Sequence, residues 1–170
     1  SETGKFIDDY TILVRNRNFP KVKYDFKEDN NYLVIETQFF RLEYAKEKPF
    51  YGSKFVPEQN LKILLKDTDK YWYFNHIEAR NFKTIGYSLD NAENIFPTSK
   101  GLYSTDGFVS IDDSDSLILR DNNFYKKPEK TIDTYVFMYK RNFGLVFRDY
   151  FLLTNKPMSI PRYMFGNIWN

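Results

Sequence analysis

A β-hairpin is predicted by Val22-Lys23-Tyr24-Asp25-Phe26, Lys27-Glu28-Asp29-Asn30-Asn31 and Tyr32-Leu33-Val34-Ile35, read in that order. Apolar and polar residues alternate in the first segment, as they must in a strand that turns one face to a core. The middle segment is rich in turn-forming residues, and the last is rich in β-branched and aromatic ones. The chain is therefore expected to fold back on itself here, with the apolar face of the first strand buried.

The same kind of segment recurs along the chain, separated by clusters of Asn, Asp, Gly, Lys and Pro. The expected strands are Thr11 to Val14, Lys21 to Phe26, Tyr32 to Thr37, Arg41 to Tyr44, Leu61 to Leu65, Tyr71 to Phe74, Gly107 to Asp112, Ser116 to Leu119 and Thr134 to Tyr139. No helices alternate with them, so the sequence predicts a mainly β fold, an antiparallel two-sheet β-sandwich. The long connection from Arg80 to Asp106 contains regularly placed apolar residues and is expected to be ordered.

One segment near the end of the chain has helical spacing. Its apolar residues at positions i, i+3, i+4, i+7 and i+8 are Phe143, Val146, Phe147, Tyr150 and Phe151. Asn142 suits the N-cap, Asn155 suits a left-handed C-terminal position, and Pro157 stops any continuation. The sequence predicts one short amphipathic helix whose aromatic stripe packs on the core.

The composition excludes several classes of function. The chain has 170 residues, with 25 Lys plus Arg against 23 Asp plus Glu, too even a balance for a nucleic-acid-binding domain. It has no Cys and a single histidine, His76, which disfavours zinc sites, thiol chemistry and a Ser/His/Asp triad. We expect His76 to be an imidazole at the end of a strand. The seven glycines form no phosphate-binding loop, so no cofactor and no metal are predicted.

Carboxylates remain as chemical groups, and the densest cluster is Asp112, Asp113 and Asp115. Adjacent residues on a strand point to opposite faces, so Asp112 and Asp113 cannot flank one scissile bond as an acid and nucleophile pair must. The cluster is best interpreted as a turn. Calcium binding is the alternative, although the glycine and distal Glu of an EF-hand loop are missing.

The final segment, Ile160 to Asn170, has the pattern of an apolar strand behind a proline and is expected to continue into further protein. No apolar run reaches the roughly 20 residues of a membrane-spanning helix. The charged start, Ser1 to Asp9, lacks the apolar middle of a signal peptide, so a cytoplasmic location is expected.

Three stretches resemble the N-terminal region of glycoside hydrolase family 31, the α-glucosidase and α-xylosidase family. The most specific is Gly101-Leu102-Tyr103-Ser104-Thr105-Asp106-Gly107-Phe108-Val109-Ser110-Ile111-Asp112-Asp113-Ser114, which is similar to the family's G-L-L-S-R-D-G-W-A-L-V-D-D-S. The others are Asn81 to Ala92 and Leu153 to Trp169, and the latter resembles L-T-G-K-P followed by P-R-Y-A-L-G-N-W-W. Asn16-Arg17-Asn18-Phe19-Pro20 is also similar to N-R-D-F-P, so the resemblance spans most of the chain.

The resemblance implies a sandwich shaped like galactose mutarotase, ahead of a (β/α)8 barrel. Residues 1–141 would be the sandwich, 142–158 a connecting helix and linker, and 159–170 the first barrel strand. The family's two catalytic aspartates lie on later barrel strands and act by retaining double displacement. The implied partners are the barrel and an α-linked oligosaccharide or glycoside, and these 170 residues alone should be inactive.

The same resemblance implies that the long N-terminal loop helps form the substrate pocket. Asp90 is then a candidate acceptor for a sugar hydroxyl, and Trp169 a candidate aromatic face for a sugar ring. Asp90 can equally be a turn residue. A second hypothesis is a free-standing carbohydrate-binding sandwich that uses Tyr71, Trp72 or Tyr73 as a stacking platform.

Overall fold

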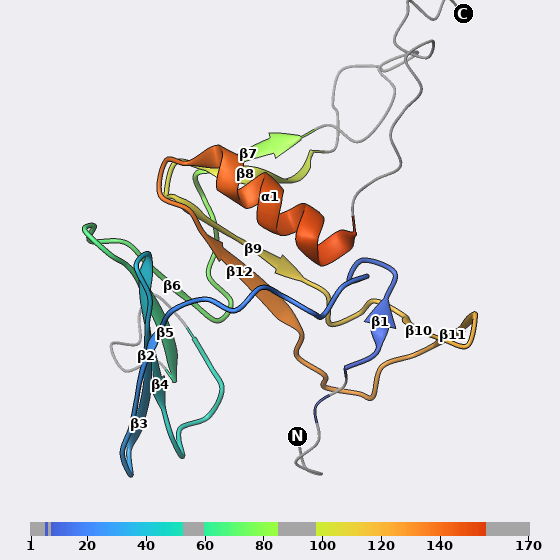
Figure 1. Ribbon diagram of the computed structural model, residues 1–170, viewed down its shortest axis with the longest axis horizontal. Coiled ribbons are helices and arrows are strands. Elements are labelled where there is room, and N and C mark those ends of the chain that lie inside the picture. Colours follow the sequence, from blue (N-terminus) through green and yellow to red (C-terminus); the bar gives the residue numbers. More distant parts are fainter. Residues whose placement is uncertain (1–5, 7, 53–59, 85–97, 156–170) are drawn as a thin grey trace, which may run out of the picture.

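The computed structural model describes residue 6 and residues 8–52, 60–84 and 98–155 of the chain. Within them the fold is mainly β with antiparallel sheets and one short helix, as predicted (Figure 1). The elements are β1 Tyr10–Thr11, β2 Asp25–Glu28, β3 Tyr32–Glu36, β4 Phe40–Ala45, β5 Leu61–Leu65, β6 Tyr71–Tyr73, β7 Asn81–Thr84, β8 Ser99–Ser104, β9 Phe108–Asp112, β10 Ile118–Arg120, β11 Asn123–Tyr125, β12 Thr134–Met138 and α1 Phe143–Thr154.

The largest sheet is a meander of five strands in the order β2-β3-β4-β5-β6. Its register places one apolar residue of each strand in a row, namely Phe26, Ile35, Leu42, Ile63 and Trp72. The opposite face carries charged side chains, including the ion pairs of Glu36 with Arg41 and Lys66. This alternation explains why the apolar face turns inward.

A second, narrower sheet of β9 and β12 covers part of that inner face. Phe108 of β9 packs with Ile63, Leu65 and Trp72, and Val136 and Met138 of β12 join the same cluster. Successive strand residues point to opposite sides, so Val109 and Phe137 face away from the larger sheet. The two sheets therefore face each other across a shared apolar core.

Helix α1 forms a third layer on the far side of β9 and β12 (Figure 1). Val146 packs with Val109 of β9 and with Tyr139, which follows β12, and both Val146 and Leu153 are buried. Asn155 has a positive φ of 60°, but its ψ of 133° lies outside the predicted left-handed helical region, and Asn142 makes no side-chain capping bond. The predicted packing of this stripe on the core is made by the buried Val146, while Phe143 and Phe147 each remain 37% exposed.

Some strand predictions need correction. The strand expected at Lys21 to Phe26 begins only at Asp25, and Val22, Tyr24 and Phe26 are all exposed. The sheet of β9 and β12 is two strands wide against five, so it leaves the β2 edge of the larger sheet uncovered by the described residues. Strands β7, β8 and β11 were not predicted. β7 and β8 make part of the Arg80 to Asp106 connection ordered, while its residues 85–97 lie outside the described residues.

Candidate functional site

Both predicted site residues, Asp90 and Trp169, lie outside the described residues. The structure does describe the two strands that flank residues 85–97, since β7 ends at Thr84 and β8 begins at Ser99. These strands form an antiparallel hairpin with an irregularity between Phe82 and Thr84. The described part of the candidate site is therefore the base of this hairpin, formed by β7 and β8.

A side-chain clamp fixes the two strands to each other. The buried Asn81 side chain accepts a hydrogen bond from the Gly101 N–H at 2.8 Å and donates one to the Gly101 carbonyl at 2.9 Å. The amide thus imitates a strand pairing at the irregularity. The backbones approach so closely that a Cβ on Gly101 would lie 2.2 Å from the Phe82 carbonyl oxygen. Gly101 of the family-like motif is therefore required by packing.

Replacing Gly101 with alanine is expected to lower the free energy of unfolding by about 1–3 kcal/mol, because the new methyl group collides with fixed backbone. Urea unfolding followed by circular dichroism measures this loss. Gly144→Ala is the matched control, since its nearest neighbour is an ordinary 3.5 Å away, and no loss is expected there. Equal stability of the two variants would contradict the close approach.

An ionic group built around a buried carboxylate joins this hairpin to the sheet of β9 and β12. The Glu78 carboxylate, whose side chain is 2% exposed, accepts hydrogen bonds from the backbone N–H of Ser110 at 2.7 Å and from its hydroxyl at 2.6 Å. Lys100 of β8 donates to the same carboxylate oxygen at 2.8 Å and also to the Ser110 carbonyl. Sequence reasoning missed this group because Glu78, Lys100 and Ser110 share no local motif.

His76 lies beside this group and matches the strand-end interpretation. Its ring contacts Tyr73 and Phe108 edge-on, with centroids 4.8 Å and 5.3 Å away. Burial lowers its pKa below the ordinary value, which the nearby Glu78 charge only partly offsets. Its Nδ1 atom is buried without a hydrogen-bond partner among the described residues. The imidazole is thus neutral at pH 7 and packed between aromatic rings.

The aspartates that follow β9 form a turn, as predicted. Asp112 accepts a hydrogen bond from the Ser114 N–H at 3.0 Å, while Asp113 points to the other side and is fully buried. The Asp113 carboxylate accepts from the Thr11 hydroxyl at 2.8 Å and pairs with Lys127 at 3.2 Å. In the described part of the chain, no three His, Cys, Asp or Glu side chains are grouped to hold a metal ion.

Lys127 is the centre of this second buried ionic group. Its side chain is 4% exposed, and its ammonium contacts Asp133 at 2.8 Å as well as Asp113. Arg17 adds a contact to Asp133 at 3.4 Å and donates to the Tyr135 hydroxyl at 2.7 Å. Burial raises the pKa of Asp133, but hydrogen bonds from Lys127 and Tyr135 and the charges of Lys127 and Arg17 outweigh it, so that pKa lies below its ordinary value.

This arrangement gives a pH dependence with a definite sign. A carboxylate whose pKa is lower in the folded state contributes stability above its unfolded pKa of about 3.9, and that stability is lost as the pH falls below it. Asp133→Asn is expected to cost about 1.5–3 kcal/mol at pH 7 and to flatten the fall in unfolding free energy between pH 5 and pH 2. Urea titrations at each pH measure this, with the exposed Asp115→Asn as the control. An unchanged acid profile in Asp133→Asn would contradict it.

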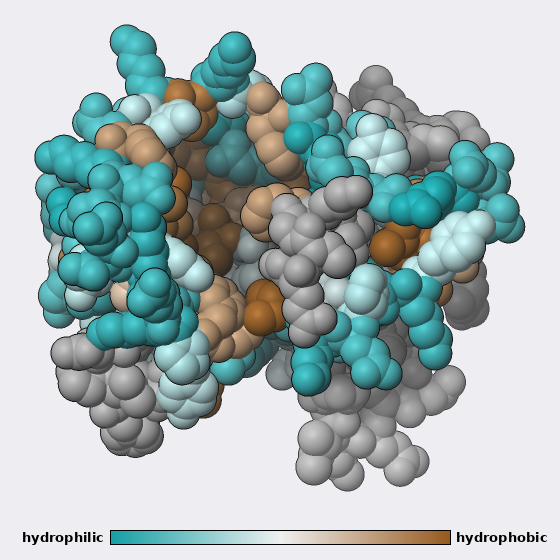
Figure 2. All heavy atoms as spheres, turned by 90° about the horizontal axis from the view of Figure 1, so that it is seen from below, coloured by the Kyte–Doolittle hydropathy of each residue, from teal (hydrophilic) through white to brown (hydrophobic). Residues whose placement is uncertain are grey.

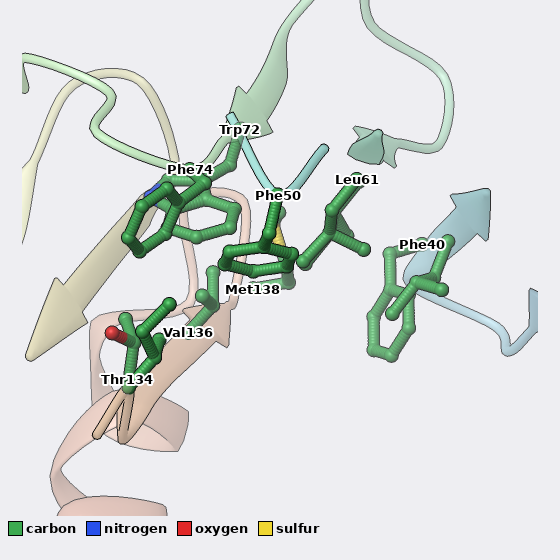
Figure 3. Close-up of a pocket in the computed structure, with 11 residues that line it drawn as sticks. Phe40, Phe50, Leu61, Trp72, Phe74, Thr134, Val136 and Met138 are labelled. Carbon is green, nitrogen blue, oxygen red and sulfur yellow. The ribbon is translucent and has the colours of Figure 1, made fainter. Parts of the chain in front are cut away.

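A cavity of about 390 Å³ opens between the two facing sheets. Figure 2 shows it as a hollow with apolar side chains inside. Its lining is Phe40, Leu42, Phe50, Leu61, Ile63, Trp72, Phe74, Ile132, Thr134, Val136 and Met138. In Figure 3, Phe50 lies against Met138, with Phe74 and Trp72 behind them. The lining offers one hydroxyl and one indole N–H but no acid, base or charged nucleophile, so it does not contain a hydrolytic centre.

Two of the three residues considered for a stacking platform on β6 are buried. Trp72 is 3% exposed and Tyr73 is 7% exposed, so neither can offer a ring face to a sugar. Tyr71 is partly exposed, but the Lys62 ammonium lies over its ring at 4.4 Å from the centroid. Of the three residues named for this alternative, only Tyr71 keeps a partly exposed ring.

No protein-family model matches the chain, and no curated protein matches it either. Among the described residues, no helix has the length and apolar character needed to cross a membrane.

Proposed function

We propose that this chain is the non-catalytic N-terminal β-sandwich of a retaining α-glycosidase of the α-glucosidase type. In this role it packs on a (β/α)8 barrel and lends residues 85–97, with Asp90 among them, to the substrate pocket. The barrel would supply both catalytic aspartates, and the substrate would be an α-linked oligosaccharide or glycoside. The family-like motifs support the proposal, as does the mainly β fold. The cytoplasmic location expected from the sequence stays a prediction.

The observation that carries the proposal is the contact between β8 and α1. Tyr103 of β8 meets Phe143 and Phe147 of α1 edge-on, with centroid distances of 4.9 Å and 5.0 Å. β8 follows residues 85–97, and α1 precedes residues 156–170, which resemble the entry into the barrel. One packed unit therefore carries the base of the loop and the start of the connection. That is the arrangement a loop needs if it is to reach a pocket in the next domain.

The test compares these 170 residues with the same chain extended by its downstream reading frame. The extended chain is expected to release nitrophenol from an aryl α-glucoside, α-xyloside or α-galactoside, while the 170 residues alone release none. In the extended chain, Asp90→Asn is expected to raise KM about tenfold if Asp90 accepts a sugar hydroxyl. Lys83→Gln, at an exposed position of β7, is the control and should leave KM unchanged. Activity of the 170 residues alone, or an inactive extended chain, would refute the proposal.

A further inference from the structure

The two strands β8 and β9 are joined by a short turn yet do not pair. Among the strands of the described residues, β8 pairs only with β7, and β9 pairs only with β12. Figure 1 shows β8 and β9 leaving their common turn in different directions. Between them opens a cleft of about 380 Å³, lined by Lys100, Gly101 and Leu102 on one side and Ser110, Ile111 and Asp112 on the other, with Leu13 and Tyr150 of α1 completing the lining. Two strands joined so closely would ordinarily form a hairpin, so something must hold them apart.

The backbone of Ser110 faces this cleft. The bonds from Asp113 N–H to the Asp133 carbonyl and from Tyr139 N–H to the Gly107 carbonyl fix the alternation between β9 and β12. In an antiparallel pair, bonded and non-bonded positions alternate, so the Ser110 N–H and C=O point away from β12. Those two groups are the ones that a pairing with β8 would use.

The side chains of Glu78 and Lys100 bind both of these backbone groups of Ser110. The Ser110 N–H donates to Glu78 at 2.7 Å, its carbonyl accepts from Lys100, and the two side chains bond to each other at 2.8 Å. We propose that Glu78 and Lys100 are positioning residues: they replace one pairing between β8 and β9, keep the strands apart, and so set the direction of the β7–β8 hairpin. The pair is called the Glu78–Lys100 bridge below.

The consequence for function rests on the proposed function, because residues 85–97 are what this hairpin carries. The Asn81 clamp fixes β7 to β8, so the hairpin moves as one piece. Its direction then depends on the contacts that hold β8 relative to β9. A loop that has to reach a substrate pocket needs such a fixed base, since a small error in direction grows with distance from the turn.

Removing both charges together tests the bridge without leaving one charge buried and unpaired. In Glu78→Leu/Lys100→Met, the Ser110 N–H and C=O lose their partners. The backbone N–H and C=O of Gly101 point toward β7, so those of Leu102 point to the other edge of β8, toward β9. The Leu102 groups can then bond to Ser110 in place of the two lost side chains. The hairpin is therefore expected to close toward β9 until the two strands lie about one strand spacing, roughly 4.8 Å, apart.

Spin labels measure this movement directly, because the chain has no cysteine of its own. Cysteines replace the exposed residues Lys83 of β7 and Asp115 beyond β9, and pulsed electron paramagnetic resonance gives their separation. The double variant should show a shorter mean separation, and Lys100→Arg, which keeps the charge, should keep the original one. Val136→Ala, a loss of apolar contact elsewhere, should lower stability without moving the labels.

An unchanged separation in the double variant overturns the inference, as does an equal shift in Val136→Ala. If the double variant does not fold, Glu78→Gln replaces it: a broadened distance distribution supports the bridge, and one identical to the original chain overturns it. Because the labels report on these 170 residues alone, a negative result leaves the glycosidase proposal standing. Conversely, an inactive extended chain would refute the glycosidase proposal without affecting the conclusion drawn from the label separation.

Discussion

Lys127→Met is expected to lower the free energy of unfolding by about 3–5 kcal/mol. The substitution keeps the length of the side chain but leaves Asp113, which is fully buried, without its positive partner. Asp133 loses its closest cation at the same time, and only the longer contact to Arg17 remains. A buried charge that loses its partner costs more than the pair contributed, so this loss should exceed that of any surface ion pair here.

Chemical unfolding in urea, followed by circular dichroism, measures the effect. Lys126→Met changes the neighbouring exposed lysine and should fall within about 0.5 kcal/mol of the original chain. Lys127→Met/Asp113→Asn removes the unpaired charge, so it should regain part of the loss. A cost below about 1 kcal/mol for Lys127→Met would show that water reaches this group, contrary to its burial.

The second large effect is expected for Phe108→Ala, with a loss of about 3–5 kcal/mol. Phe108 is 1% exposed and joins the two sheets, because it lies on β9 while its cluster partners Ile63, Leu65 and Trp72 lie on β5 and β6. Its ring also contacts the His76 ring edge-on, at a centroid distance of 5.3 Å. Truncation of Phe108 would leave a second cavity beside the one already present between the two sheets, since Ile63 and Trp72 contact Phe108 and also line that cavity.

Phe124→Ala provides the control, since Phe124 is 57% exposed on β11 and should contribute less than about 0.5 kcal/mol. Midpoint and slope of urea unfolding separate lost stability from a change in the exposed surface. Equal losses in the two phenylalanine variants would mean that the sheets do not share a core, and the sandwich arrangement would be wrong.

Patterns that repeat over a few residues predicted the fold well. Strand β5, Leu61–Leu65, has the bounds expected from its apolar run, and α1 begins and ends where the helical spacing does. β12, Thr134–Met138, likewise falls within the strand expected at Thr134 to Tyr139. These elements are decided locally, by side chains whose neighbours in sequence are also their neighbours in space.

The hairpin of β7 and β8 could not be predicted in the same way. Ser99 to Ser104 has no apolar alternation, and its pairing depends on the Asn81 amide and on the missing side chain of Gly101. The prediction that the apolar face of the first hairpin strand is buried was wrong for a related reason. Alternation in Val22 to Phe26 shows that one face is apolar, but only the width of the opposing sheet decides whether that face is covered.

Part of the candidate site could be predicted from the sequence. The turn at Asp112 followed from the strand geometry, whereas the partners of Asp113 did not, because Thr11 is 102 positions away. The Glu78–Lys100 bridge likewise joins residues 22 positions apart. Ionic groups of this kind have no periodic signature, since a single charged residue in a polar stretch looks the same whether it is exposed or buried.

The segment from Thr11 to Arg17 finds its partners late in the chain. The N–H groups of Arg15 and Asn16 donate to the Leu153 carbonyl, and the Asn16 side chain donates to the Leu152 carbonyl 136 positions further on. During synthesis at roughly 5–20 residues per second, the partner of Asn16 is made on the order of ten seconds after Asn16 itself. Arg15 and Asn16 must therefore wait until Leu153 has been made before this layer of the native state can form.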